Sequence, residues 1–149
     1  MCRWHGACCV VGLTERRDMV HKLICPLYID IPRKTTDDKR YYINIGIYRN
    51  AHYHVNAAAK RLYKAAMREQ LEGLKIKTPV EIGYKVFKPT QRRLDKMNVA
   101  AATSKFLLDA ITEYGCWPDD NDDYVKTETI YPTEYDKNNG RVEVTIREI

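Results

Sequence analysis

The chain has 149 residues, of which 44% are apolar and 30% charged, and its formal net charge is +5. This length suits one domain that buries roughly 70% of the surface of the unfolded chain, and the composition is that of a globular protein. No apolar run reaches about 18 residues, so we expect no membrane span, no membrane partner and a cytoplasmic location.

The cysteines number five, and this odd count argues against a disulfide framework and for a reducing compartment. Cys2, His5, Cys8 and Cys9 lie close together in the sequence but lack the paired arms of a closed zinc site. Residues 1–18 show neither strand alternation nor a helical stripe, whereas a patterned segment starts soon after Met19. We therefore predict a disordered leader over 1–18 and one domain over 19–149.

Two strands are predicted before the first helix. Apolar residues alternate with polar or turn residues from Leu23 to Ile31, and Pro26 favours an edge strand. A charged loop follows over residues 32–40. The second strand is predicted from three alternating isoleucines, Ile43, Ile45 and Ile47.

A cluster of two histidines, two tyrosines and an arginine ends this second strand, over residues 48–54. These side chains either stack on bases and bind phosphates, or form a loop that covers the edge of the core. A helix is then predicted from Asn56, as its N-cap, to Leu74. Its expected apolar stripe consists of Ala58, Leu62, Ala65 and Ala66. Its basic face, expected to lie in water, consists of Lys60, Arg61, Lys64 and Arg68.

A third strand is predicted after Pro79, over residues 80–87, and leads into a basic segment. The next helix is expected to be capped by Asn98 and to end at Gly115. Its expected buried stripe consists of Val99, Ala102, Phe106 and Ala110. Lys105 and Asp109 lie one turn apart and off this stripe.

Two C-terminal strands are predicted at about 124–132 and 141–148, and residues 138–140, Asn-Asn-Gly, are typical of a hairpin turn between them. The predicted order is β-β-α-β-α-β-β. This order indicates a single α+β domain in which two helices pack on a mixed sheet.

Charge is distributed unevenly along the chain. Residues 60–96 hold eleven Lys and Arg against four acids, whereas residues 113–123 hold five acids and no base. A basic region beside an acidic turn suits a polyanion held over a metal site. The candidate nucleic-acid contacts are Arg49, His52, Lys88, Arg92, Arg93 and Lys96.

Cleavage of a phosphodiester needs an activated water and stabilisation of charge on the phosphate, and Mg²⁺ held by carboxylates supplies both. A nearby lysine adds a fixed positive charge. The residues that the sequence offers for this chemistry are Asp95, Lys105, Asp109, Asp119 and Asp120.

The ordered set of motifs from residue 79 to the C-terminus, roughly half of the chain, resembles the RusA family of Holliday-junction resolvases. Its basic run, aspartate and asparagine correspond to residues 92–98, Arg-Arg-Leu-Asp-Lys-Met-Asn. A helical lysine, an Asp-Ala-Leu motif and a Gly-x-Trp-x-Asp-Asp motif follow, as Lys105, residues 109–111 and residues 115–120.

The resemblance implies a Mg²⁺-dependent homodimer, with Mn²⁺ as an alternative ion and no organic cofactor, that nicks four-way DNA junctions at symmetric positions. A phage or prophage origin suits such a small stand-alone domain. The resemblance assigns metal binding to Asp95 and Asp120 and the catalytic lysine to Lys105. A two-fold dimer would present two identical sites to a pseudo-symmetric junction.

The chain departs from the family pattern at two points. Met97 stands where the family has a second aspartate, and the interval from Asn98 to Lys105 is longer by four residues, about one helical turn. One added turn keeps Lys105 and Asp109 on the same helix face. Candidates for the missing ligand are Asp109 first, then Asp119 or Asn98.

Three functions are consistent with these residues. The first is a junction-resolving endodeoxyribonuclease, which requires Asp95, Lys105 and Asp120 to lie within about 10 Å of one another so that they share ions. The second is a non-catalytic module that binds junctions or duplex DNA and has lost a metal ligand at Met97. The third is a nuclease that acts on other branched or flapped DNA.

Overall fold

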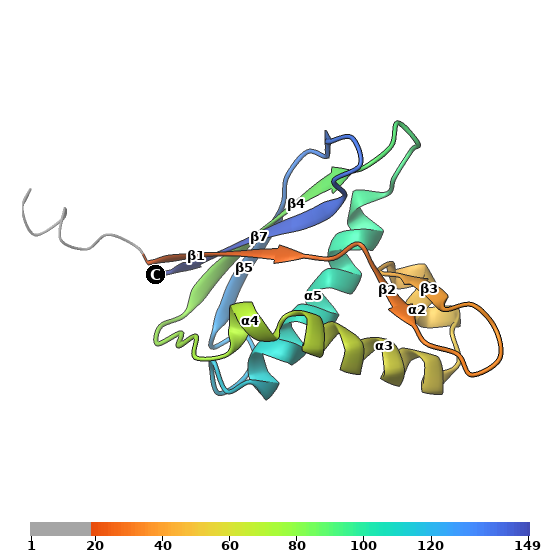
Figure 1. Ribbon diagram of the computed structural model, residues 1–149. Helices are drawn as coiled ribbons and strands as arrows, with labels where there is room; N and C mark the ends of the chain where they lie inside the picture. Colours follow the sequence, from red (N-terminus) through yellow and green to blue (C-terminus); the bar gives the residue numbers. More distant parts are fainter. Residues whose placement is uncertain (1–18) are drawn as a thin grey trace, which may run out of the picture.

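A five-stranded mixed sheet is the largest element of the computed structural model, which describes residues 19–149 (Figure 1). Its strands are β1 (Val20–Cys25), β4 (Val80–Lys88), β5 (Val125–Ile130), β6 (Glu134–Tyr135) and β7 (Arg141–Glu148). The order is β1-β7-β4-β5, and β6 pairs with the end of β4. β1–β7 and β7–β4 are antiparallel, whereas β5 and β6 are parallel to β4.

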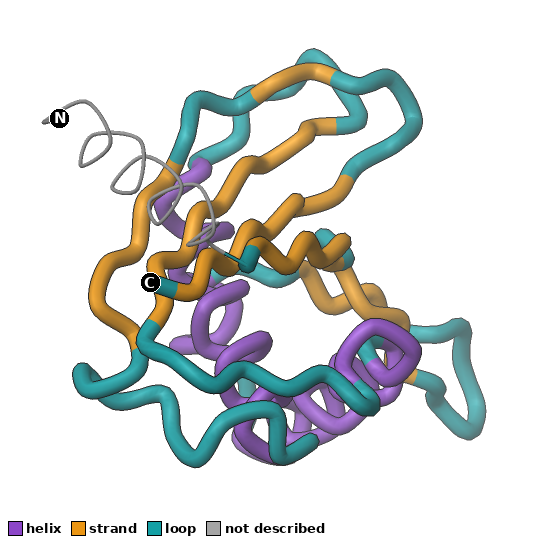
Figure 2. Tube along the Cα trace, turned by 90° about the vertical axis from the view of Figure 1, so that its left-hand side faces the viewer, coloured by secondary structure: helices purple, strands orange, loops and turns teal. Residues whose placement is uncertain are grey.

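A separate two-stranded ribbon and four helices complete the described part of the chain. The ribbon consists of β2 (Tyr28–Ile31) and β3 (Lys39–Tyr42). The helices are α2 (Ile45–Asn50), α3 (Tyr53–Ala66), α4 (Arg68–Leu71) and α5 (Lys96–Glu113). Figure 1 shows the ribbon and α2 at one end of the molecule and α3 running from there toward the sheet. Figure 2 shows the helices gathered on one side of the strands. The predicted α+β class with a mixed sheet is therefore confirmed.

The β4–α5–β5 unit forms the centre of the fold, because its sequence is patterned to bury one face of the strand and a wide face of the helix. Val80, Ile82, Tyr84 and Val86 alternate along β4, and all are at most 1% exposed. The predicted stripe of α5, from Val99 to Ala110, is buried as well. Burial of these side chains contributes about 1.5–3 kcal/mol for each large apolar residue.

An aromatic cluster joins the helices to the ribbon. The ring of Phe106 on α5 lies 6.0 Å from that of Tyr41, 5.4 Å from Tyr63 and 5.9 Å from Tyr48, measured between centroids. Edge-to-face and offset pairs at such distances add about 0.5–1.5 kcal/mol each beyond their burial. Tyr48 is thereby held against α5, which matters for the site described below.

The predicted first strand is two strands in different sheets. β1 ends at Cys25 and β2 begins at Tyr28, with Pro26 between them. Pro26 has no amide hydrogen to donate, which favours a break at this point. β1 is an edge strand of the main sheet, as predicted.

The predicted strand through Ile43, Ile45 and Ile47 is wrong, because residues 45–50 form α2. The side chain of Asn44 accepts a hydrogen bond from the backbone N–H of Gly46 at 2.8 Å and so caps the new helix. Ile47 is consequently 42% exposed, whereas Ile43 and Ile45 are buried.

The helix predicted over residues 56–74 begins earlier and is divided into α3 and α4. His52 is the N-cap of α3. The side chain of Asn56 accepts from the Tyr41 hydroxyl (2.6 Å) and donates to the Tyr48 carbonyl (2.8 Å), which ties α3 to β3 and α2. The expected stripe was also wrong, because Ala65 and Ala66 are exposed while Ala59, Tyr63 and Met67 are buried. The buried face of α3 therefore includes Tyr63, which the expected apolar stripe left out.

The residues Asn138, Asn139 and Gly140 do not form a turn between paired strands. β7 pairs with β1 and β4, and β5 and β6 lie along the other edge of β4. The hairpin prediction is therefore wrong, because the long apolar strand β4 separates the two C-terminal strands. Asn138 does adopt a left-handed conformation with φ 59°, as the turn-forming tendency of asparagine favours.

Glu148 at the end of β7 anchors the segment that enters β4. Its carboxylate accepts hydrogen bonds from the backbone N–H groups of Lys77 (2.8 Å) and Thr78 (3.3 Å) and lies 3.0 Å from the His21 ring. The side chain is only 7% exposed. These contacts lower the pKa of Glu148 although its burial acts in the opposite direction.

Two predictions concern the N-terminus and the membrane. The leader over 1–18, with its candidate zinc ligands, lies outside the described residues. Among residues 19–149, every helix is too short or too polar to cross a bilayer.

Candidate functional site

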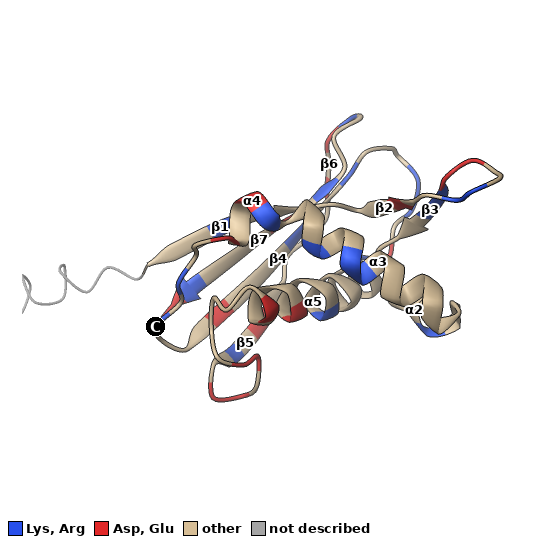
Figure 3. Cartoon of the chain, turned by 60° about the horizontal axis from the view of Figure 1, so that its bottom comes forward, with Lys and Arg blue, Asp and Glu red and all other residues tan. Residues whose placement is uncertain are grey.

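Three carboxylates gather at the C-terminal end of α5. Asp109 belongs to the last turns of the helix, and Asp119 and Asp120 lie in the loop before β5. Figure 3 shows this acidic end of α5 beside the acidic loop. The exit from the helix is fixed by Gly115, at φ 73°, and by a hydrogen bond of 2.7 Å from the Trp117 indole to the Thr112 hydroxyl. The sequence thus folds this loop back to the end of its own helix.

Hydrogen bonds within the loop orient the Asp119 carboxylate. The backbone N–H of Asp120 donates to Asp119 Oδ1 at 2.8 Å, and the amide of Asn121 donates to Oδ2 at 3.2 Å. Partial burial, the adjacent carboxyl of Asp119 and the negative charge of Asp109 raise the pKa of Asp120. A raised pKa from neighbouring carboxylates marks a place where a cation would be stabilised.

Two lysines border this acidic cluster, which comprises Asp109, Asp119 and Asp120. Lys60 Nζ on α3 lies 3.2 Å from Asp109 Oδ2. Lys105, one turn before Asp109, is exposed and has no acidic partner within 4.0 Å in the described chain. Both ammonium groups lie over the ring of Tyr48, at 5.3 Å for Lys60 and 5.7 Å for Lys105. Cation–π contacts of this kind stabilise a lysine by about 0.5–1 kcal/mol at exposed sites.

The structure separates Asp95 from this cluster. Asp95 is the N-cap of α5, and its Oδ1 accepts from the backbone N–H groups of Met97 (3.0 Å) and Asn98 (3.4 Å). It lies about 21 Å along the helix from Asp109, at 1.5 Å per residue. The expectation that Asp95, Lys105 and Asp120 share one cleft is therefore wrong, as is the prediction of Asn98 as the cap. The 18-residue length of α5 keeps its two ends apart.

The predicted nucleic-acid contacts also fall into separate groups. Lys88, Arg92, Arg93 and Lys96 surround the N-terminal end of α5, in or next to the loop that leaves β4. Arg49 ends α2, and His52 begins α3. The rings of His52, Tyr53 and His54 stack on one another with centroids 3.9–4.9 Å apart. Neither group lies at the acidic cluster, which is at the opposite end of α5 from the basic loop.

Sequence reasoning missed the roles of Lys60 and Tyr48. Lys60 was expected to face water. Its partner Asp109 is 49 positions away in the sequence, so no local pattern indicated the pairing. Sequence reasoning also missed a polar contact beside Lys105. The Ser104 and Tyr84 hydroxyls both donate to Glu128 Oε1, at 2.8 and 2.5 Å. This contact fixes the middle of α5 to β5.

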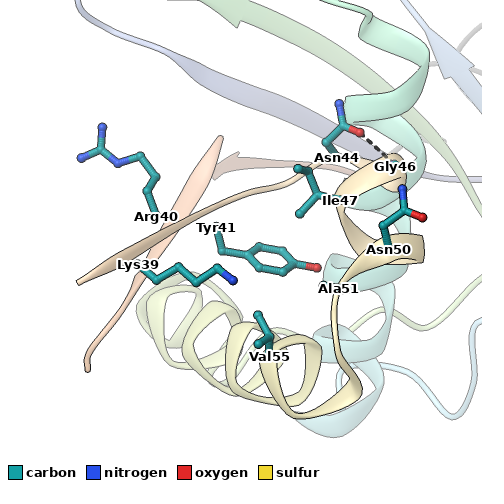
Figure 4. A pocket seen from close by; sticks show the side chains of 9 residues that line it. All are labelled: Lys39, Arg40, Tyr41, Asn44, Gly46, Ile47, Asn50, Ala51 and Val55. Atoms are coloured by element: carbon teal, nitrogen blue, oxygen red, sulfur yellow. Dashed lines mark hydrogen bonds between the residues drawn. The ribbon is translucent and has the colours of Figure 1, made fainter. Parts of the chain in front are cut away.

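Two hollows lie near the ribbon rather than near the acidic cluster. The first has a volume of about 480 Å³ between β3, α2 and the start of α3. Figure 4 shows that Lys39 reaches across it toward Tyr41, while Arg40 points away. The second, of about 820 Å³, lies between the ribbon and the basic loop.

Within residues 19–149, no group of three or more His, Cys, Asp or Glu side chains lies close enough together to hold a metal ion. The interaction of Asp109 and Asp119 with Asp120 is therefore an electrostatic one, through the raised pKa of Asp120. Cys25 and Cys116 are free and buried. Comparison of the chain with models of protein families and with curated proteins gave no match.

Proposed function

We propose that this protein is a Mg²⁺-dependent endodeoxyribonuclease that acts on branched DNA, with four-way junctions as its preferred substrate. The proposed metal site consists of Asp109, Asp119 and Asp120 without Asp95, and so differs from the site that the sequence predicts. The observation that carries the proposal is the position of Asp109, Asp119 and Asp120 together at the end of α5, where burial and the two neighbouring carboxylates raise the pKa of Asp120. Lys105 lies one helical turn before Asp109. The resemblance of residues 79–149 to RusA resolvases supports the choice of substrate.

The carboxylates at the end of α5 fit a magnesium ion in their chemistry. Mg²⁺ is commonly held by one or two carboxylates together with phosphate oxygens of the substrate, and not by an all-protein cage. Asp119 and Asp120 would supply the carboxylates, and Asp109 takes the place of the ligand that Met97 lacks. When bound, the ion lowers the pKa of a water molecule and neutralises charge on the phosphate.

The lysines supply positive charge at fixed positions on the helix surface. Lys105 holds the scissile phosphate beside the acidic cluster, because its ammonium is not neutralised by an acid in the described chain. Lys60 restrains Asp109 through their ion pair, and a metal ion bound by Asp109 would have to displace this ammonium group from the carboxylate. A two-fold dimer places two such sites on one junction.

A second candidate is a module that binds branched or duplex DNA without cutting it. The separation of Asp95 from the acidic cluster favours it, as does the 57% exposure of Met97 at the position of the family's second aspartate. This candidate keeps the basic loop and predicts salt-sensitive binding that is independent of Mg²⁺.

The test is nicking of a labelled four-way DNA junction in Mg²⁺ or EDTA, next to linear duplex and a flap. The decisive variant is Asp120→Asn, and its matched control is Asp122→Asn, an exposed acid of the same loop. Symmetric nicks that EDTA and Asp120→Asn abolish, and that Asp122→Asn preserves, would support the nuclease. Tight junction binding without nicks in either Mg²⁺ or Mn²⁺ would support the binding module. Cleavage of flaps in preference to junctions would move the proposal to another branched substrate.

A further inference from the structure

The larger hollow is a groove at the N-terminal end of α5, lined by the ribbon on one side and by the basic loop on the other. Its volume is about 820 Å³, within the range of about 300–1,000 Å³ found for ligand sites. Its basic lining residues are Arg40, Lys88, Arg92 and Arg93. None of the lining residues is acidic. The groove is therefore suited to a polyanion.

Two tyrosines of the ribbon give the groove an aromatic wall. Antiparallel pairing places Tyr28 opposite Tyr42, with the ring centroids 6.1 Å apart. The alternation of the strands buries Ile29 and Tyr41 in the core and turns Tyr28 and Tyr42 outward, where they are 41% and 53% exposed. Large exposed aromatic faces beside cations are typical of surfaces that bind single-stranded nucleic acid.

Three of the four basic groups of the groove are available to a ligand, and the fourth, Arg40, already has partners. The Arg40 guanidinium lies 4.0 Å from the centroid of the Tyr28 ring and pairs with Asp30 at 3.2 Å on the same face of the ribbon. In the part of the chain that the structure describes, Lys88, Arg92 and Arg93 have no acidic side chain within 4.0 Å. Three cations thus face the tyrosines without an internal counter-charge.

We propose that this groove binds an unpaired strand of DNA. Tyr42 stacks on its bases, Tyr28 with Arg40 over its ring forms the adjoining wall, and Lys88, Arg92 and Arg93 contact its phosphates. The inference extends the proposed function, because branched DNA exposes unpaired bases near its branch point. A duplex would leave the tyrosines unused, since paired bases hide their faces within the stack.

The groove is a better stacking surface than the cluster of His52, Tyr53 and His54. The rings of that cluster already cover one another at centroid distances of 3.9–4.9 Å. The groove is also remote from the acidic cluster, since α5 extends about 27 Å at 1.5 Å for each of its 18 residues. Strand binding should therefore be independent of cleavage.

The experiment measures the affinity of the full chain for a short fluorescein-labelled oligo(dT) by fluorescence anisotropy in EDTA. Tyr42→Ala should weaken binding roughly 5- to 150-fold, the range of one base–aromatic stacking interaction. The matched control Tyr42→Phe keeps the ring and should bind as the wild type does. The double variant Arg92→Gln/Arg93→Gln should lower the slope of log affinity against log salt by about 1.4, which corresponds to two phosphate contacts on a single strand.

Several results would overturn the proposal. These are equal affinities of Tyr42→Ala and wild type, tighter binding of a duplex of the same length, and loss of binding in Tyr53→Ala alone. Tighter binding of oligo(U) than of oligo(dT) would overturn the choice of DNA. Because no metal is present, the outcome is separate from that of the nuclease proposal: Asp120→Asn should abolish nicking and leave oligo(dT) affinity unchanged.

Discussion

Replacement of Asp95 distinguishes a helix cap from a metal ligand. Asp95→Ala removes the acceptor of the Met97 and Asn98 amide hydrogens, and loss of an N-cap typically costs about 1 kcal/mol, within a range of 0.5–2. For a domain of this size, that loss corresponds to a fall in Tm of about 2–5 °C. Asparagine caps helices as well as aspartate does, so Asp95→Asn should unfold as the wild type does.

Junction cleavage by both Asp95 variants should remain close to that of the wild type, because about 21 Å of helix lies between Asp95 and Asp109. Urea unfolding followed by circular dichroism gives the stability, and nicking of a labelled junction in Mg²⁺ gives the activity. If Asp95→Asn kept wild-type stability but lost cleavage, Asp95 would be a ligand in the active assembly. Our placement of the catalytic centre would then be wrong.

Three further predictions concern the core and two titrating carboxyls. Phe106→Ala should reduce the free energy of unfolding by about 3–5 kcal/mol, measured in urea, because it leaves a cavity among the rings of the aromatic cluster; a loss below about 1 kcal/mol would contradict this packing. Glu148 has a lowered pKa in the folded state, so its stabilisation is present above its ordinary pKa of 4.5 and disappears as pH falls through the folded-state value. Unfolding titrations should therefore show a smaller loss of stability in acid for Glu148→Gln than for the wild type, and equal losses would refute the assignment. The raised pKa of Asp120 has the opposite sign: its contribution to stability is most favourable below its ordinary pKa of 3.8 and disappears as pH rises through the folded-state value. In an NMR titration of the metal-free protein, the Asp120 carboxyl should titrate above its ordinary pKa of 3.8, and its midpoint should move to lower pH in Asp119→Asn; an unmoved midpoint would contradict the coupling.

The alternation of apolar residues predicted strand β4, and helical periodicity predicted the buried face of helix α5. The β4 strand and the buried stripe of α5 follow directly from the placement of Val80, Ile82, Val99 and Phe106, because burial selects apolar residues at the period of the backbone. Alternation of three isoleucines misled at α2. In the short helix α2 only Ile45 is buried, so the sequence shows no helical stripe there. The side chain of Asn44 caps the helix and so favours a helix over a strand at this point.

Pairing across long sequence separations could not be predicted from local pattern. The chain does turn near Asn138 and Gly140, as the sequence predicted. The strand that pairs with β7 is nevertheless the long buried strand β4, which is distant in the sequence. The sequence predicted Asp95, Asp109, Asp119 and Asp120 as one group of candidate ligands. Their division into Asp95 at one end of α5 and Asp119 and Asp120 at the other follows from the length of the helix, which a motif alone does not specify.

The most direct test of the proposed centre is to locate bound Mn²⁺ by its paramagnetic broadening of amide signals in NMR spectra of the ¹⁵N-labelled protein. We predict selective broadening at Asp109, Asp119 and Asp120, reversed by excess Mg²⁺ and absent in Asp120→Asn. Signals of Met97 and Asn98 should remain sharp. Broadening centred on residues 95–98, with the Asp119 and Asp120 signals unaffected, would contradict the account and return the metal site to the N-terminal end of α5.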